Sequence, residues 1–111
     1  MTRPAMAWSI LIVAGLLEIG WSLGFKLSQA GDRRVAGLAV AAVCMFASGV
    51  LLWMAQRDIP IGTAYAVWTG IGAAGTFLIG IAWFGDAVTP VRIGSVFLII
   101  AGVIGLKISH A

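Results

Sequence analysis

The sequence predicts an all-α integral membrane protein with four transmembrane helices. Of its 111 residues, 61% are hydrophobic and only 10% are charged, whereas soluble domains carry roughly 25% charged residues. The charges and turn-forming residues divide the chain into four apolar segments, each near the ~20 residues that a helix needs to cross a bilayer core. A single membrane domain covering residues 1–111 is therefore expected.

The four helices are expected at residues 5–26, 35–55, 61–84 and 91–108. The first contains one charged residue well inside it, Glu18, and the second and third contain none. In the fourth, the uncharged core from Ile93 to Leu106 is short, but Arg92 and Lys107 can reach the two membrane interfaces and lengthen the span. Short connections with Gly, Pro and Asp residues reverse the chain between the helices.

The charge and the metal-binding residue types exclude several functions. The net charge is +3, but the cations are scattered at helix ends, so we expect contact with anionic lipid headgroups and not with nucleic acid. Cys44 and His110 are the single cysteine and histidine, which leaves no disulfide and no metal-ligand spacing. We therefore expect no cofactor, no metal and no enzymatic activity.

Positive charges are nearly balanced between the two sides of the membrane. One side carries Arg3, Arg57 and Lys107, and the other carries Lys26, Arg33, Arg34 and Arg92. Because an excess of Lys and Arg sets orientation, a difference of one leaves both insertion in two orientations and a weak single orientation open. Four short helices cannot easily enclose a hydrated pathway, and an antiparallel pair of identical chains would recreate the inverted repeat of larger transporters.

Glu18 is the residue with the clearest chemistry. A charged side chain within a transmembrane helix costs at least ~2.5 kcal/mol, and such residues usually carry function. Its carboxyl group can hold either a proton or a cation. In the alternative interpretation, Glu18 stays protonated and only bonds a neighbouring helix during assembly.

Several residues are placed to support this carboxyl group. Helical spacing puts Gly15 and Trp21 on the face of Glu18, so the indole N–H of Trp21 lies one turn away. Ser48, in the middle of the second segment, is another possible donor.

Aromatic and small residues mark the third and fourth segments. Tyr65 and Trp68 share one helix face, where their rings can wall a cationic ligand, although single aromatic residues often belong to the membrane-interface belt. Gly70 and Gly72 permit close packing or a kink. The fourth segment carries a stripe of small residues suited to a helix–helix or dimer interface, namely Gly94, Ala101 and Gly105.

The chain from Met6 to Ser109 resembles the small multidrug resistance family, whose members have four short helices and a single membrane Glu in the first. It is most similar to the guanidinium exporter subtype. The features that carry this similarity are Glu18 followed by Trp21 and Lys26, the segment PIGTAYAVWTG at 60–70, and the ending Gly105-Leu106-Lys107. Trp21 and Thr69 together separate the subtype from the family's multidrug members.

The resemblance implies an antiparallel, dual-topology homodimer in the bacterial inner membrane that exchanges protons for guanidinium by alternating access. It implies that Glu18 of both subunits binds the substrate or protons. The roles it implies for the other residues are a small neighbour for Gly15, a mobile binding-site tyrosine for Tyr65, hydrogen bonds that position the carboxylate for Trp21, Ser48 and Trp68, and a kink in the third helix for Gly70 and Gly72. Gly20 and Ser22 depart from the subtype's usual bulkier or apolar residues.

Three other functions remain open. The first is export of multidrug or quaternary ammonium cations within the same family. The second is a passive cation channel, which the absence of a pore-lining ring of polar residues disfavours. The third is a non-transporting assembly subunit, in which Glu18 needs only to form a hydrogen bond.

Overall fold

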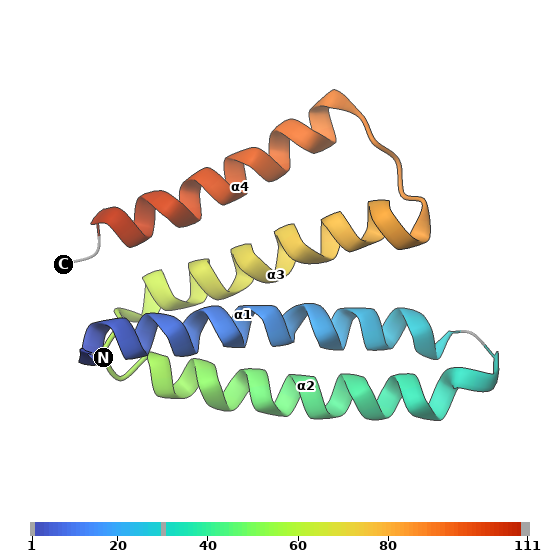
Figure 1. Ribbon diagram of the computed structural model, residues 1–111, viewed down its shortest axis with the longest axis horizontal. Coiled ribbons are helices and arrows are strands. Elements are labelled where there is room, and N and C mark those ends of the chain that lie inside the picture. The colour runs from blue at the N-terminus through green and yellow to red at the C-terminus, as the bar shows by residue number, and fades with distance from the viewer. Residues whose placement is uncertain (1, 30, 110–111) are drawn as a thin grey trace.

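The computed structural model describes residues 2–29 and 31–109 and contains four long helices (Figure 1). They are α1 (Arg3–Ser28), α2 (Arg34–Ala55), α3 (Ile61–Phe84) and α4 (Pro90–Ser109), and a 3-10 turn, η1 (Gly31–Arg33), precedes α2. Each helix is long and apolar enough to cross a membrane. The prediction of an all-α protein with four such helices is confirmed. His110, considered above as a metal ligand, lies outside the described residues.

The helix ends extend slightly beyond the apolar segments. The α1 helix begins two residues before the predicted range and ends two residues after it, and α4 is one residue longer at each end. Capping explains the added N-terminal residues: the Thr2 hydroxyl accepts a hydrogen bond from the Ala5 N–H at 3.3 Å, and the Thr89 hydroxyl accepts one from the Arg92 N–H at 3.2 Å. Hydrophobicity marks the membrane span, whereas polar caps set where the helix starts.

The α1 helix lies between α2 and α3, and α4 lies on the far side of α3 (Figure 1). Both termini and the α2–α3 connection are at one end of the bundle, and the α1–α2 and α3–α4 connections are at the other. Across Pro90–Ser109, Val96 is the one buried residue of α4. Three helices therefore form the packed body of the chain, and α4 is attached to it along a single side.

Glycines bring the backbones of α1 and α2 into direct contact. A Cβ atom added to Gly24 would lie 2.8 Å from the Gly37 carbonyl oxygen, and one added to Gly37 would lie 2.7 Å from the Gly24 carbonyl oxygen. No side chain fits between the helices at this level. Such close approach of small residues stabilises helix pairs in a bilayer, where burial from water gives no driving force.

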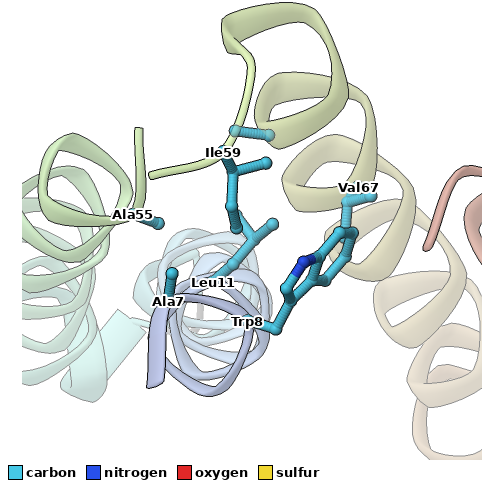
Figure 2. Packing of buried hydrophobic residues seen from close by; sticks show 7 residues of the cluster. Ala7, Trp8, Leu11, Ala55, Ile59 and Val67 are labelled. Atoms are coloured by element: carbon cyan, nitrogen blue, oxygen red, sulfur yellow. The ribbon is translucent and has the colours of Figure 1, made fainter. Parts of the chain in front are cut away.

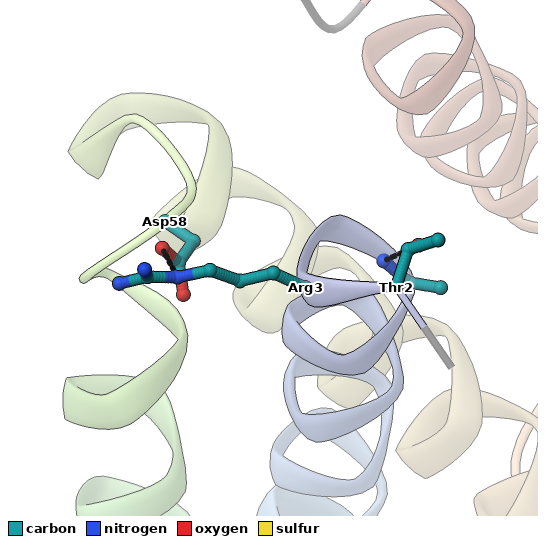
Figure 3. A network of polar contacts seen from close by, with 4 residues as sticks. Thr2, Arg3 and Asp58 are labelled. Carbon is teal, nitrogen blue, oxygen red and sulfur yellow. Dashed lines mark hydrogen bonds and ion pairs between the residues drawn. The ribbon is translucent and has the colours of Figure 1, made fainter.

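A cluster of buried apolar residues lies where the start of α1 meets the α2–α3 connection (Figure 2). Side chains from α1, α2, α3 and the α2–α3 connection meet there: Ala7, Trp8, Leu11, Ala55, Ile59, Ala64 and Val67. Arg3 reaches from α1 to this connection and donates a hydrogen bond from Nε to Asp58 Oδ1 at 2.7 Å (Figure 3). Because Arg3 is exposed, this ion pair contributes at most ~1 kcal/mol, and the apolar contacts dominate.

The glycine contact gives a first prediction. Gly37→Ala should destabilise the chain by about 1–3 kcal/mol, the usual cost of forcing an atom into a filled space, because the neighbouring atoms are backbone and cannot rotate away. The measurement is unfolding of the purified protein in mixed detergent micelles. Gly49→Ala is the matched control on the same helix, since its added Cβ meets nothing within 4 Å. Equal stability of the two variants would contradict the backbone contact.

Candidate functional site

A buried hydrogen-bond chain joins three helices at the middle of the bundle. The hydroxyl of Ser48 on α2 donates to the Ala14 carbonyl of α1 at 2.6 Å, and the indole Nε1–H of Trp68 on α3 donates to the Ser48 oxygen at 2.8 Å. Ser48 is completely buried. Ala14 lies four residues before Glu18, so the chain fixes α2 and α3 against the helical turn that precedes the carboxyl group.

Glu18 lies against the backbone of α3. A Cβ atom added to Gly72 would lie 2.8 Å from the Glu18 Cδ atom, so only glycine leaves room for the carboxyl group there. The Oε2 atom is buried and has no hydrogen-bond partner among residues 2–29 and 31–109. A buried acceptor without a donor is costly, and a ligand that supplies N–H groups or a proton would remove that cost.

An open cavity of about 380 Å³ extends from Glu18 toward the α3–α4 connection. Its aromatic and hydroxyl-bearing walls come from α1 and α3, and two charged residues line it from the connection and from α4. These residues are Trp21, Ser22, Thr69, Thr76, Phe77, Asp86 and Arg92. The site therefore combines a carboxyl group, aromatic rings and hydroxyl groups around one open space.

The other predicted site residues lie in different parts of the structure. Trp21 lines the cavity with Glu18 and packs edge-on against Phe25, with ring centroids 5.4 Å apart. Tyr65 is 56% exposed and lies beside Trp68, with ring centroids 5.5 Å apart. In this single chain, the hydrogen bonds of Ser48 and Trp68 thus end on the Ala14 carbonyl, and their direct bonding to the carboxylate stays a prediction.

The predicted glycines allow close approach between helices. A Cβ atom on Gly15 would lie 2.8 Å from Ile71 Cβ, and one on Gly70 would lie 2.6 Å from Val103 Cγ2 of α4. The α3 helix is continuous through Gly70 and Gly72, so their role as a kink stays a prediction.

The small-residue stripe of α4 faces away from the rest of the chain. A Cβ atom added to Gly94 or Gly105 meets nothing within 4 Å, and Ala101 is exposed. Their role in a dimer interface also stays a prediction.

The two departures from the subtype lie on different sides of α1. A Cβ atom on Gly20 would lie 2.6 Å from the Cys44 sulfur of α2, so Gly20 is a packing position. Ser22 lines the cavity beside Glu18 and adds a hydroxyl to its wall.

The sequence analysis did not predict five of the cavity residues, among them Ala73. Thr76 and Phe77 continue the α3 face that begins at Thr69, at spacings of seven and eight residues, so helical periodicity could have indicated them. Asp86 and Arg92 could not be assigned from spacing, because only the tertiary fold brings the α3–α4 connection over this face. The guanidinium group of Arg92 lies over the Phe77 ring, and its extension to the membrane interface stays a prediction.

The chain combines four apolar helices with a carboxyl group whose Oε2 atom has no hydrogen-bond partner among the described residues, and this combination is typical of small multi-pass membrane transport proteins. The chain belongs to the small multidrug resistance family, because residues 6–99 match the family described as Small Multidrug Resistance protein.

Known relatives cover almost the whole chain. A guanidinium exporter of Yersinia pseudotuberculosis is 50% identical over 104 residues, which are 94% of this chain and 99% of that protein. The guanidinium exporters of Escherichia coli K12 and Citrobacter freundii are 45% and 44% identical, each over 94% of this chain and 98% of the relative. These comparisons confirm the family resemblance.

The hydrogen-bond chain gives a second prediction. Ser48→Ala should destabilise the protein by ~1–3 kcal/mol, because the buried indole N–H of Trp68 loses its acceptor. Unfolding in mixed micelles measures the change. Ser95→Ala is the control, since the exposed Ser95 hydroxyl bonds only the Val91 carbonyl of its own helix. Equal losses in both variants would show that the interhelical bond contributes nothing.

Proposed function

We propose that this protein exports guanidinium in exchange for protons, as an antiparallel, dual-topology homodimer in the inner membrane of a bacterium. The observation that carries the proposal is the Glu18 carboxyl group, which lines a cavity with aromatic walls and whose buried Oε2 atom has no hydrogen-bond donor among the described residues. Relatives of nearly equal length that are named guanidinium exporters support the same substrate.

Guanidinium matches the chemistry of this cavity. It is planar and weakly hydrated, and its N–H groups form paired hydrogen bonds with a carboxylate. The ring face of Trp21 can stack on the cation, and the hydroxyls of Thr69 and Thr76 can accept its remaining N–H groups. A quaternary ammonium ion has no N–H donor and would leave these acceptors unpaired, so we favour guanidinium over the multidrug alternative.

Proton coupling follows from competition for one group. A carboxyl group that has bound a proton cannot form an ion pair with a cation, so protonation of Glu18 releases guanidinium and deprotonation readmits it. If the site opens to each side of the membrane in turn, the inward proton gradient drives guanidinium outward. This cycle needs only Glu18 and a change of access, and it requires no cofactor.

A second copy of the chain would complete the site. One chain leaves the cavity open, and α4 exposes large apolar side chains such as Phe97, Leu98 and Ile104 together with its small-residue stripe. A second α4 packed on this surface would cover it. Nearly equal positive charge at the two ends of the bundle, three residues against four, supports insertion in both orientations.

The third prediction tests the carboxyl group. In proteoliposomes with a pH-sensitive dye, guanidinium should drive proton movement in the wild type, and Glu18→Gln should reduce it to the background of empty liposomes. Glutamine keeps hydrogen-bonding atoms but cannot ionise, so an assembly role would survive the change. Asp32→Asn is the matched control, because Asp32 is an exposed carboxylate in η1 outside the cavity.

The same assay separates the alternatives. Guanidinium flux without proton movement would indicate a channel, and a response to tetrapropylammonium but not to guanidinium would indicate the multidrug function. Unchanged exchange in Glu18→Gln would overturn the proposed mechanism.

A further inference from the structure

The cavity of Glu18 already holds a guanidinium group, which belongs to the chain itself. The Cζ atom of Arg92 lies 4.8 Å from the centroid of the Phe77 ring, and its Nε–H donates a hydrogen bond to the Ala87 carbonyl at 2.8 Å. Arg92 and Phe77 both line the cavity with Glu18. An aromatic face and a carbonyl oxygen thus bind a planar, N–H-bearing cation in the space that leads to the carboxyl group.

A carboxylate, that of Asp86, lines the same cavity. The α3–α4 connection turns at Gly85, whose φ of 68° is left-handed, and the Asp86 N–H then donates to the Gly80 carbonyl at 3.1 Å. Gly80 makes room for the turned-back side chain, because an added Cβ would lie 3.2 Å from Asp86 Cγ. Among the described residues Asp86 forms no ion pair with Arg92, so its oxygens are available to another cation.

Arg92 is held by groups that a free guanidinium ion could use equally well. Its side chain is exposed and joined to the backbone by a flexible stem, so it can leave the Phe77 ring without any change in the helices. While attached, it competes with dissolved cations at the high effective concentration that a short tether gives. The bound position of Arg92 therefore marks a binding site whose occupant can be exchanged.

We infer that the Phe77 ring face, the Ala87 carbonyl and the Asp86 carboxylate form an outer guanidinium-binding subsite on the route between Glu18 and the end of the bundle. Arg92 occupies this subsite in the absence of substrate, and a transported guanidinium ion displaces it. The inference rests on the proposed function, because it assigns a second binding position to the same substrate. It makes Arg92 an internal competitor that sets the apparent affinity for guanidinium.

The fourth prediction is a change in KM that depends on Phe77. Arg92→Gln should lower the KM for guanidinium by roughly two- to fivefold, the range that loss of one competing cation–π contact gives. In a Phe77→Leu background, which keeps apolar bulk but removes the ring, Arg92→Gln should leave the KM unchanged. The measurement is guanidinium-driven current on solid-supported membranes, with variants first checked for the wild-type elution volume in detergent.

A charge control separates competition from simple electrostatic repulsion. Lys26 is a cation in a neighbouring cavity of about 270 Å³ that shares Ser22, Thr76 and Asp86 with the first. If Arg92 acted only through its charge, Lys26→Gln would lower the KM equally, and Arg92→Gln would act equally with and without Phe77. Either outcome, or no shift in Arg92→Gln, would overturn the subsite.

A second measurement uses the unmodified protein. The Nε–H resonance of Arg92, which is bonded to the Ala87 carbonyl, should move in ¹⁵N NMR spectra when guanidinium chloride is added, and an equal concentration of sodium chloride should not move it. A resonance that stays in place while guanidinium drives transport would overturn the subsite and leave the proposed function intact. A wild type that gives no guanidinium-driven current would instead overturn the proposed function.

Discussion

The hydrogen bond between Trp68 and Ser48, continued to the Ala14 carbonyl, is the polar contact on which the site depends. In hydrocarbon, burial from water cannot hold helices together, so packing and interhelical hydrogen bonds must do so. These two hydrogen bonds link α1, α2 and α3 one turn before Glu18. The carboxyl group therefore projects from a part of α1 that is tied to both neighbouring helices, while its buried Oε2 atom has no hydrogen-bond partner among residues 2–29 and 31–109.

The pattern of small residues complements that bond. Gly15 and Gly72 bring α1 and α3 together on either side of the carboxyl group, and Gly24 and Gly37 do the same for α1 and α2. Each absent side chain is replaced by a direct contact with a neighbouring helix. The helices near Glu18 are consequently close together, and the cavity beside Glu18 is lined as far as Asp86 in the α3–α4 connection.

Much of the fold could be predicted from the sequence, because one property, the length of an uncharged apolar segment, identifies a transmembrane helix. The observed helix ends differ from the predicted ones by one or two residues. At the starts of α1 and α4 the caps are the polar residues Thr2 and Thr89, and the length of an apolar segment does not indicate where such caps lie. Glu18 was predictable as a site residue, because a charged side chain is unusual within a transmembrane helix. Asp86 and Arg92 resemble ordinary residues at a helix end, and only the return of the chain over α3 brings them to the cavity.

The contact between Gly24 and Gly37 has a mechanical consequence. Two helices whose backbones touch have no layer of side chains that could adopt new rotamers, so they cannot slide past one another without a clash. The α1–α2 hairpin is thus expected to move as one rigid unit. Deformation of the chain would then fall mainly on the sparsely packed α4, which is attached to α3 along a single side.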